Sequence, residues 1–187
     1  CYNGWYNGHG LGLGELHKGH WQAVKPDWYY ACGEFGAEGL DPVNTMLKHY
    51  PREWLPRNQD PQSPWTPLSI PRAQTQAFHY MWFNTQNSLE HWVDASQTHQ
   101  AWAIRLQTEA MRRDNNMVSF ALHLFIDAWP AGWMKTIMDV DRQPKKAFFV
   151  YRDALNPVLA TLRTDRYHFS SHEKIAIDAW LSNDLNS

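Results

Sequence analysis

The sequence predicts an α/β fold, because two strongly apolar runs that each end at an acidic residue are separated by a helical pattern. Residues 28–33 form a short aromatic and apolar run that ends at Glu34, which is typical of a buried strand. Residues 117–126 form a near-continuous apolar run that ends at Asp127. A run of this kind fits a strand covered on both faces, as in a parallel sheet.

Two further segments predict helices. In residues 90–113, apolar and small residues recur at helical spacing, and the segment has no glycine or proline. Residues 144–155 fit a short amphipathic helix, with a proline in its first turn and Pro157 after its end. The predicted order is therefore strand, long loop, helix, strand and helix.

The remaining segments predict loops and a second unit. Residues 1–21 are rich in glycine, and residues 51–71 contain six of the 11 prolines, so both are expected to be irregular. Long loops in compact domains are often functional. After Pro157, apolar and polar residues alternate in 158–162 and again in 175–179. This alternation predicts antiparallel strands that begin a separate β domain.

Composition excludes several classes of protein. The chain has 187 residues with 17 basic and 19 acidic side chains, and this balance speaks against nucleic-acid binding. No apolar run approaches the length of about 18 residues that a membrane span needs, so no membrane partner is expected. Two cysteines are too few for a disulfide framework. The chain starts without methionine and stops just after an alternating pattern, so we expect it to be a piece of a longer protein.

Metal and cofactor sites are not expected. His9, His17 and His20 lie close together, but their spacing matches no closed tetrahedral zinc site. The glycines of residues 10–14 lack the spacing of a phosphate-binding loop. Cys32 lies inside a predicted strand, where a cysteine is more often a small buried apolar residue than a nucleophile.

Glu34 is the first candidate for chemistry. A carboxylate at the carboxyl end of a strand in a parallel β/α barrel points into the mouth of the active site. Gly33 and Gly36 flank it, so the backbone can bend and a ligand can approach closely. The alternative is an ordinary helix N-cap or an ion-pair residue.

Aromatic residues supply the other candidates. Trp129 follows the second strand and could stack on the C–H face of a sugar, or it could plug the end of the barrel. The hydroxyl of Tyr2 could donate a hydrogen bond to a neighbouring carboxylate if the first residues end another strand. Otherwise Tyr2, Trp5 and Tyr6 are core aromatics. Trp54, Trp65 and Trp82 could line further subsites or pack the long loop.

Four motifs together resemble glycoside hydrolase family 2, which includes β-galactosidases, β-glucuronidases and β-mannosidases. They are YNGWY at 2–6, GEFG at 33–36, DAWP at 127–130 and DVDRQPKKAFF at 139–149, and they span nearly the whole chain. The resemblance implies that residues 1–156 are the C-terminal part of a catalytic (β/α)8 TIM barrel, strands six to eight. Residues 157–187 would be the first strands of an immunoglobulin-like β-sandwich.

The resemblance also implies a retaining mechanism with Glu34 as nucleophile. Tyr2 would contact that nucleophile, and Trp129 would form the floor of the sugar subsite. A second carboxylic acid, roughly 5–5.5 Å from the first, would protonate the leaving oxygen. We further expect three residues to contact the substrate: Trp5, Asp127 and Lys135.

Two departures from the family pattern limit these expectations. The family's acid/base glutamate follows an asparagine, and the chain contains no Asn-Glu pair, so we expect that residue to lie upstream and these residues alone to be inactive. Where β-glucuronidases have Asn-x-Lys, the chain has Trp133-Met134-Lys135. The tryptophan disfavours a sugar carboxylate, so a neutral galactoside or mannoside is the expected substrate.

Three functions therefore remain open. The first is a retaining β-glycosidase with a carbohydrate as its partner, in a full-length protein that could form a homo-oligomer. The second is a non-catalytic carbohydrate-binding protein on the same scaffold. The third is a free-standing small α/β protein with a structural aromatic core.

Overall fold

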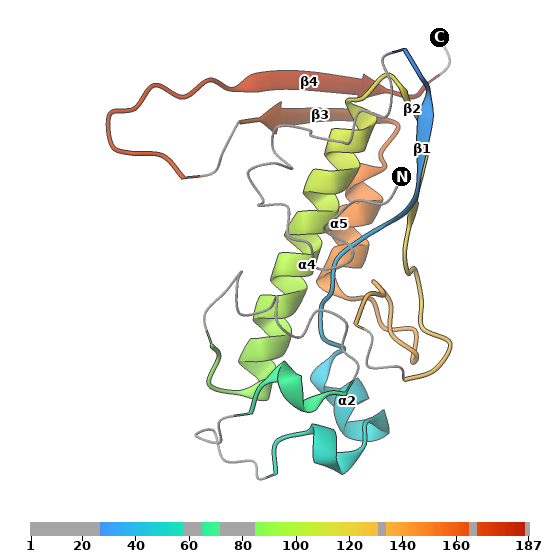
Figure 1. The fold of residues 1–187 in the computed structure, drawn as a ribbon, viewed down its shortest axis with the longest axis vertical. Coiled ribbons are helices and arrows are strands. Elements are labelled where there is room, and N and C mark those ends of the chain that lie inside the picture. The colour runs from blue at the N-terminus through green and yellow to red at the C-terminus, as the bar shows by residue number, and fades with distance from the viewer. Residues whose placement is uncertain (1–26, 58–64, 72–84, 131–133, 165–167, 186–187) are drawn as a thin grey trace.

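The computed structural model describes residues 27–57, 65–71, 85–130, 134–164 and 168–185, which form a mixture of helices and strands (Figure 1). In these residues β1 pairs with β2 and β3 pairs with β4. The elements in chain order are β1 (Tyr30–Phe35), α2 (Val43–His49), the single-turn 3-10 helices η1 (Arg52–Trp54) and η2 (Pro67–Ser69), α4 (Leu89–Arg112), β2 (Met117–Leu122), α5 (Lys146–Ala154), β3 (Val158–Arg163) and β4 (Asp178–Asn183).

Strands β1 and β2 are parallel neighbours, as the sequence predicts, and α4 lies between them in the chain. Helices α4 and α5 run side by side along this pair (Figure 1). Cys32 and Phe35 of β1 are buried against residues of α4 and α5 such as Ile104 and Ala147. The burial of Cys32 confirms its assignment as a buried apolar residue.

Helix α4 confirms the strongest helical prediction to within a residue at each end. It begins at Ser88, whose hydroxyl accepts a hydrogen bond from the backbone N–H of His91 at 3.2 Å, as an N-cap residue does. One face carries buried small and apolar residues that pack on the sheet, including Ala103 and Ile104. The same face also buries several polar side chains, which contact the site described below.

Strand β2 differs from the prediction in length and burial. It ends at Leu122 rather than at Ile126, and it is exposed on one face, where Val118 is 65% exposed. The expectation of a strand covered on both faces is therefore wrong for the described residues. The reason is that α4 and α5 pack on one face of the β1–β2 pair. Beyond Leu122 the chain makes only an isolated bridge, between Ile126 and Met138.

The loop after β1 contains more structure than its prolines predict. Helix α2 was not predicted, and η1 and η2 are single turns within the proline-rich segment. Trp65 is buried, and its indole N–H donates to the carbonyl of Trp54 at 2.8 Å. Trp92 of α4 donates in turn to the carbonyl of Trp65 at 3.2 Å. Trp65 therefore packs the loop onto the helix, while Trp82 lies outside the described residues.

Strands β3 and β4 form an antiparallel hairpin after Pro157 (Figure 1). The first strand matches the predicted alternation, but the second begins at Asp178, so Ile175 and Ile177 precede it and are exposed. Ala160 pairs with Leu181, and this register places the second strand closer to the C-terminus than the predicted residues 175–179. In the described part of the chain, no helix is long and apolar enough to cross a membrane.

Candidate active site

Glu34 lies near the carboxyl end of β1 and is half-buried. The neighbouring residue of the parallel strand is His123, just after β2, whose backbone N–H donates to the carbonyl of Phe35 at 2.9 Å. The two side chains are close enough for the charge of Glu34 to act on the imidazole. The strand pairing therefore brings a carboxylate and an imidazole together where both strands end.

Gly36 allows the two strand ends to approach each other. A β-carbon at this position would lie 2.7 Å from the carbonyl oxygen of His123, which is backbone and has little room to move. The φ angle of Gly36 is +157°, a value that residues with a side chain rarely adopt. The glycine after Glu34 and Phe35 is therefore required by close backbone packing.

Gly36→Ala is expected to destabilise the protein by about 1–3 kcal/mol, the usual cost of overpacking. Urea unfolding measures this effect. Gly33→Ala is the matched control, because a β-carbon at Gly33 would meet no atom within 4 Å. Equal effects of the two substitutions would show that the contact with His123 does not constrain the strand ends.

The charges of four ionisable groups interact in this region: Glu34, Glu38, His123 and Lys135. Burial lowers the pKa of His123, and the charge of Glu34 opposes this shift. Burial also lowers the pKa of Lys135, against the opposing effects of Glu38 and, more weakly, Glu34. His123 was not predicted from the sequence. Its signal was a single imidazole in an otherwise apolar run that contains only one other polar residue, Ser119.

The lowered pKa of His123 predicts a loss of stability in acid. A base with a folded-state pKa below its ordinary value of 6.5 binds fewer protons when folded than when unfolded. Stability is therefore lost as the pH falls from above 6.5 toward the lowered pKa. His123→Gln removes this contribution, so the stability advantage of the parent protein over the variant should shrink between about pH 7.5 and about pH 5. Urea titrations across this range measure it, and a constant difference would contradict the expectation.

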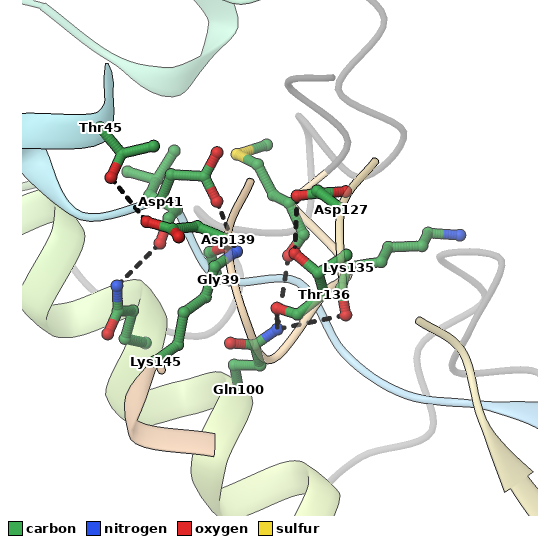
Figure 2. Close-up of polar contacts among 12 residues, drawn as sticks. Gly39, Asp41, Thr45, Gln100, Asp127, Lys135, Thr136, Asp139 and Lys145 are labelled. Atoms are coloured by element: carbon green, nitrogen blue, oxygen red, sulfur yellow. Dashed lines mark hydrogen bonds and ion pairs between the residues drawn. The ribbon is translucent and has the colours of Figure 1, made fainter. Parts of the chain in front are cut away.

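A buried polar network holds the segment that follows Glu34 (Figure 2). The ammonium of Lys145 lies 2.8 Å from a carboxylate oxygen of Asp41 and donates to the carbonyl of Gly39 at 2.9 Å. The hydroxyl of Tyr50 donates to the other oxygen of Asp41 at 2.8 Å. Nearby, Asp139 accepts a hydrogen bond from Thr45 at 2.6 Å. Because the Lys145 and Asp41 side chains are almost fully buried, each charge depends on the other.

Helix α4 supplies amide side chains to the same segment. The side-chain amide of Gln100 donates to the carbonyls of Ala37 at 2.9 Å and Thr136 at 3.0 Å. The amide of Gln97 donates to the carbonyl of Leu40 at 2.9 Å. These bonds satisfy backbone groups that belong to no helix or strand. They connect the segment after β1 to the segment around Lys135.

The residues predicted after the second strand have different environments. The Asp127 carboxylate is buried and accepts a hydrogen bond from the Thr136 hydroxyl at 2.8 Å, while burial raises its pKa. Trp129 is 67% exposed. Lys135 is buried, and its side chain extends away from the Asp127–Thr136 pair (Figure 2).

The described residues thus bring together only part of the predicted site. The charge of Glu34 acts on Lys135, whereas the Asp127 carboxylate accepts a hydrogen bond from Thr136. Tyr2 and Trp5 lie outside the described residues, as do Tyr6, Trp133 and the three histidines weighed for zinc. In the part of the chain that the structure describes, no group of three or more His, Cys, Asp and Glu residues is placed to bind a metal ion.

Comparisons with known proteins find a likeness in structure. No protein-family model matches the sequence, and no curated protein is significantly similar to it. The fold is similar to part of the crystal structure of a β-D-mannosidase from Dictyoglomus thermophilum, with a TM-score of 0.64 and 12% sequence identity. The match covers 97% of this chain and 25% of that one, so the chain spans about a quarter of the mannosidase's length. At this identity the likeness concerns the fold alone.

Proposed function

We propose that the chain provides the nucleophile of a retaining β-glycosidase that acts on neutral sugars, β-mannosides first and β-galactosides second. Its first 156 residues would be the C-terminal part of a (β/α)8 barrel, and the remainder would begin a β-sandwich. The observation that carries the proposal is a half-buried Glu34 at the carboxyl end of a parallel strand, in a fold similar to part of a β-D-mannosidase. Active sites of β/α barrels are built at this end of the strands.

In the proposed reaction, a carboxylate oxygen of Glu34 attacks the anomeric carbon of the sugar. The bond to the leaving oxygen breaks as a second carboxylic acid donates its proton to that oxygen, and a glycosyl ester on Glu34 remains. The second carboxylate then takes a proton from water, which attacks the same carbon and releases the sugar and Glu34. Because the sequence has no Asn-Glu pair, we assign the second group to residues outside this chain and expect these 187 residues alone to be inactive.

The other predicted residues would bind or position the sugar. Trp129 would stack on the C–H face of the ring, Tyr2 would donate to Glu34, and Trp5 would line the subsite. We assign Asp127 to the loop that carries Trp129, since its carboxylate already accepts a hydrogen bond from Thr136. The bulky Trp133 supports a neutral substrate, as do the charges of Glu38 and Glu34 that act on Lys135.

Trp129→Ala in the complete protein is expected to raise KM for an aryl β-mannoside by roughly two- to tenfold, since an aromatic stacking contact is worth about 0.5–1.5 kcal/mol. Unfolding should change little because the ring is exposed. Trp102→Ala, which removes a partly exposed ring from α4, is the matched control and should leave KM unchanged. A matching loss of stability with no change in KM would remove Trp129 from the subsite.

Covalent trapping tests the proposed function itself. The complete protein is incubated with a 2-deoxy-2-fluoro aryl β-mannoside bearing a good leaving group, and the labelled peptide is identified by mass spectrometry. We expect the 2-fluoromannosyl group on Glu34. A label on another residue would remove Glu34 from the role. Saturable sugar binding without turnover or label would favour the non-catalytic carbohydrate-binding alternative instead.

A further inference from the structure

We propose that Glu38 determines specificity at this site. Its buried carboxylate neutralises the charge of the Lys135 ammonium near Glu34. In this way it restricts the site to sugars without a carboxylate. The inference rests on the proposed function and deepens it. It also revises the expectation that Lys135 binds the substrate, because the Lys135 ammonium then interacts with its carboxylate neighbours and not with the sugar.

Backbone geometry places Glu38 beside Lys135. The backbone N–H of Gly39 donates to the carbonyl of Met134 at 2.8 Å, so the residues that follow Glu38 and precede Lys135 are paired directly. The Gln100 side chain contacts carbonyls on both sides of this pairing, at Ala37 and at Thr136. Relative exposure is 5% for Glu38 and 2% for Lys135. Two buried, oppositely charged residues are therefore fixed on adjoining segments by contacts that do not involve their own side chains.

The electrostatics of the region rank the partners of Lys135. Glu38, on the segment after β1, has the larger effect on the ammonium, and Glu34 at the strand end has the smaller one. His123, on the neighbouring strand end, is the fourth ionisable group, and burial keeps it toward its neutral form. The lysine side chain extends away from the Asp127–Thr136 pair (Figure 2). The charges of two carboxylates therefore act on Lys135, and Glu38 is the one whose segment is paired with that of the lysine.

This arrangement has a consequence for substrate choice. A sugar carboxylate entering beside Glu34 would meet two carboxylates and one ammonium whose charge is already balanced by Glu38. An uncharged hydroxymethyl group requires no counter-ion and loses nothing. Removing the charge of Glu38 would free Lys135 to pair with a carboxylate of the substrate, because a buried charge without a partner is costly.

The test compares two substrates of the complete natural protein, an aryl β-mannoside and the corresponding aryl β-mannuronide, which differ only at C6. Glu38→Gln is expected to raise the mannuronide-to-mannoside ratio of kcat/KM by roughly tenfold to a hundredfold, the value of one hydrogen bond to a charged group. Glu38→Asp keeps the charge and should leave the ratio near that of the parent. Glu53→Gln, which removes an exposed carboxylate on η1, is a further control and should do the same. The double variant Glu38→Gln/Lys135→Met should lose the gain.

A pH profile separates this role from a structural one. Lys135→Gln should move the acidic limb of kcat/KM for the mannoside to higher pH, because a positive charge beside the carboxylates is lost. Glu38→Gln should move it to lower pH. A stable Glu38→Gln variant with an unchanged ratio would overturn the proposal, and so would limbs that do not shift in opposite directions. If Glu38→Gln fails to fold, two other results would overturn the proposal. One is an acidic limb of kcat/KM that does not shift in Lys135→Gln, and the other is a parent protein that prefers the mannuronide.

The same experiment distinguishes failure of the inference from failure of the proposed function. A parent protein that hydrolyses the mannoside and is labelled on Glu34, with no response of the ratio to Glu38→Gln, contradicts only the inference. A parent protein that hydrolyses neither the mannoside nor the galactoside contradicts the proposed function.

Discussion

Glu34→Gln in the complete protein is expected to lower kcat/KM for an aryl β-mannoside by roughly 10³-fold or more, as is usual when a covalent nucleophile is removed. Glutamine has nearly the same shape but cannot form the glycosyl ester, so binding of the neutral sugar should persist. Steady-state kinetics and calorimetric titration of a non-hydrolysed mannoside measure the two properties. Glu53→Gln controls for the loss of one negative charge and should change neither.

Chemical rescue makes this prediction specific for a nucleophile. In Glu34→Gly the space left by the carboxylate can admit azide, which can attack the anomeric carbon of a substrate with a good leaving group. We expect azide to restore release of the aryl group and to give an α-mannosyl azide, because one displacement inverts the configuration. A β-mannosyl azide, or a variant whose activity matches the parent, would contradict the assignment of Glu34.

Local patterns in the sequence predicted much of the fold. Helix α4 has one amphipathic pattern without interruption, and β1 and β2 are bounded apolar runs, so each follows from residues close in the chain. Helix α2 was missed because its residues, VNTMLKH, form only two turns and carry little periodicity. The end of β2 was misjudged because apolar residues continue past Leu122 while strand pairing does not. Pairing is a property of two segments, and one segment cannot reveal it.

The candidate site likewise combines features that a local pattern predicts with features that depend on distant segments. The position of Glu34 near the end of a strand, between glycines, could be predicted from the sequence. The position of His123 could not, because it is set by the hydrogen bond to Phe35 of the other strand. The relation between Glu38 and Lys135 also depends on Gln100, which lies 63 residues after Ala37 and 36 residues before Thr136. Contacts at such separations are set by the packed fold and leave no local pattern.

The network around Lys145 is a further set of contacts between residues that are far apart in the chain. Lys145, just before α5, reaches the carbonyl of Gly39 and the carboxylate of Asp41, which lie on the segment that follows Glu34. Tyr50, just after α2, binds the same carboxylate. The segment that follows Glu34 is therefore held by side chains from distant parts of the chain. This dependence predicts that a change at Lys145 will affect stability.

Lys145→Met is expected to destabilise the complete protein by about 3–5 kcal/mol, because among the described residues it leaves the buried Asp41 carboxylate with only the Tyr50 hydroxyl as a partner. Urea unfolding followed by tryptophan fluorescence measures the loss. The double variant Asp41→Asn/Lys145→Met removes both charges and keeps an acceptor for Tyr50, so it should recover a large part of that loss.

The neighbouring lysine provides a matched control. Lys146 pairs with Asp94 at 2.5 Å, but both side chains are largely exposed, at 44% and 69%. Exposed pairs contribute little because water screens their charges, so Lys146→Met should cost less than about 1 kcal/mol. Equal effects at Lys145 and Lys146, or a double variant less stable than Lys145→Met alone, would show that the buried pair does not hold the segment after Glu34. In that case the position of Glu34 would depend mainly on the Gln97 and Gln100 amides.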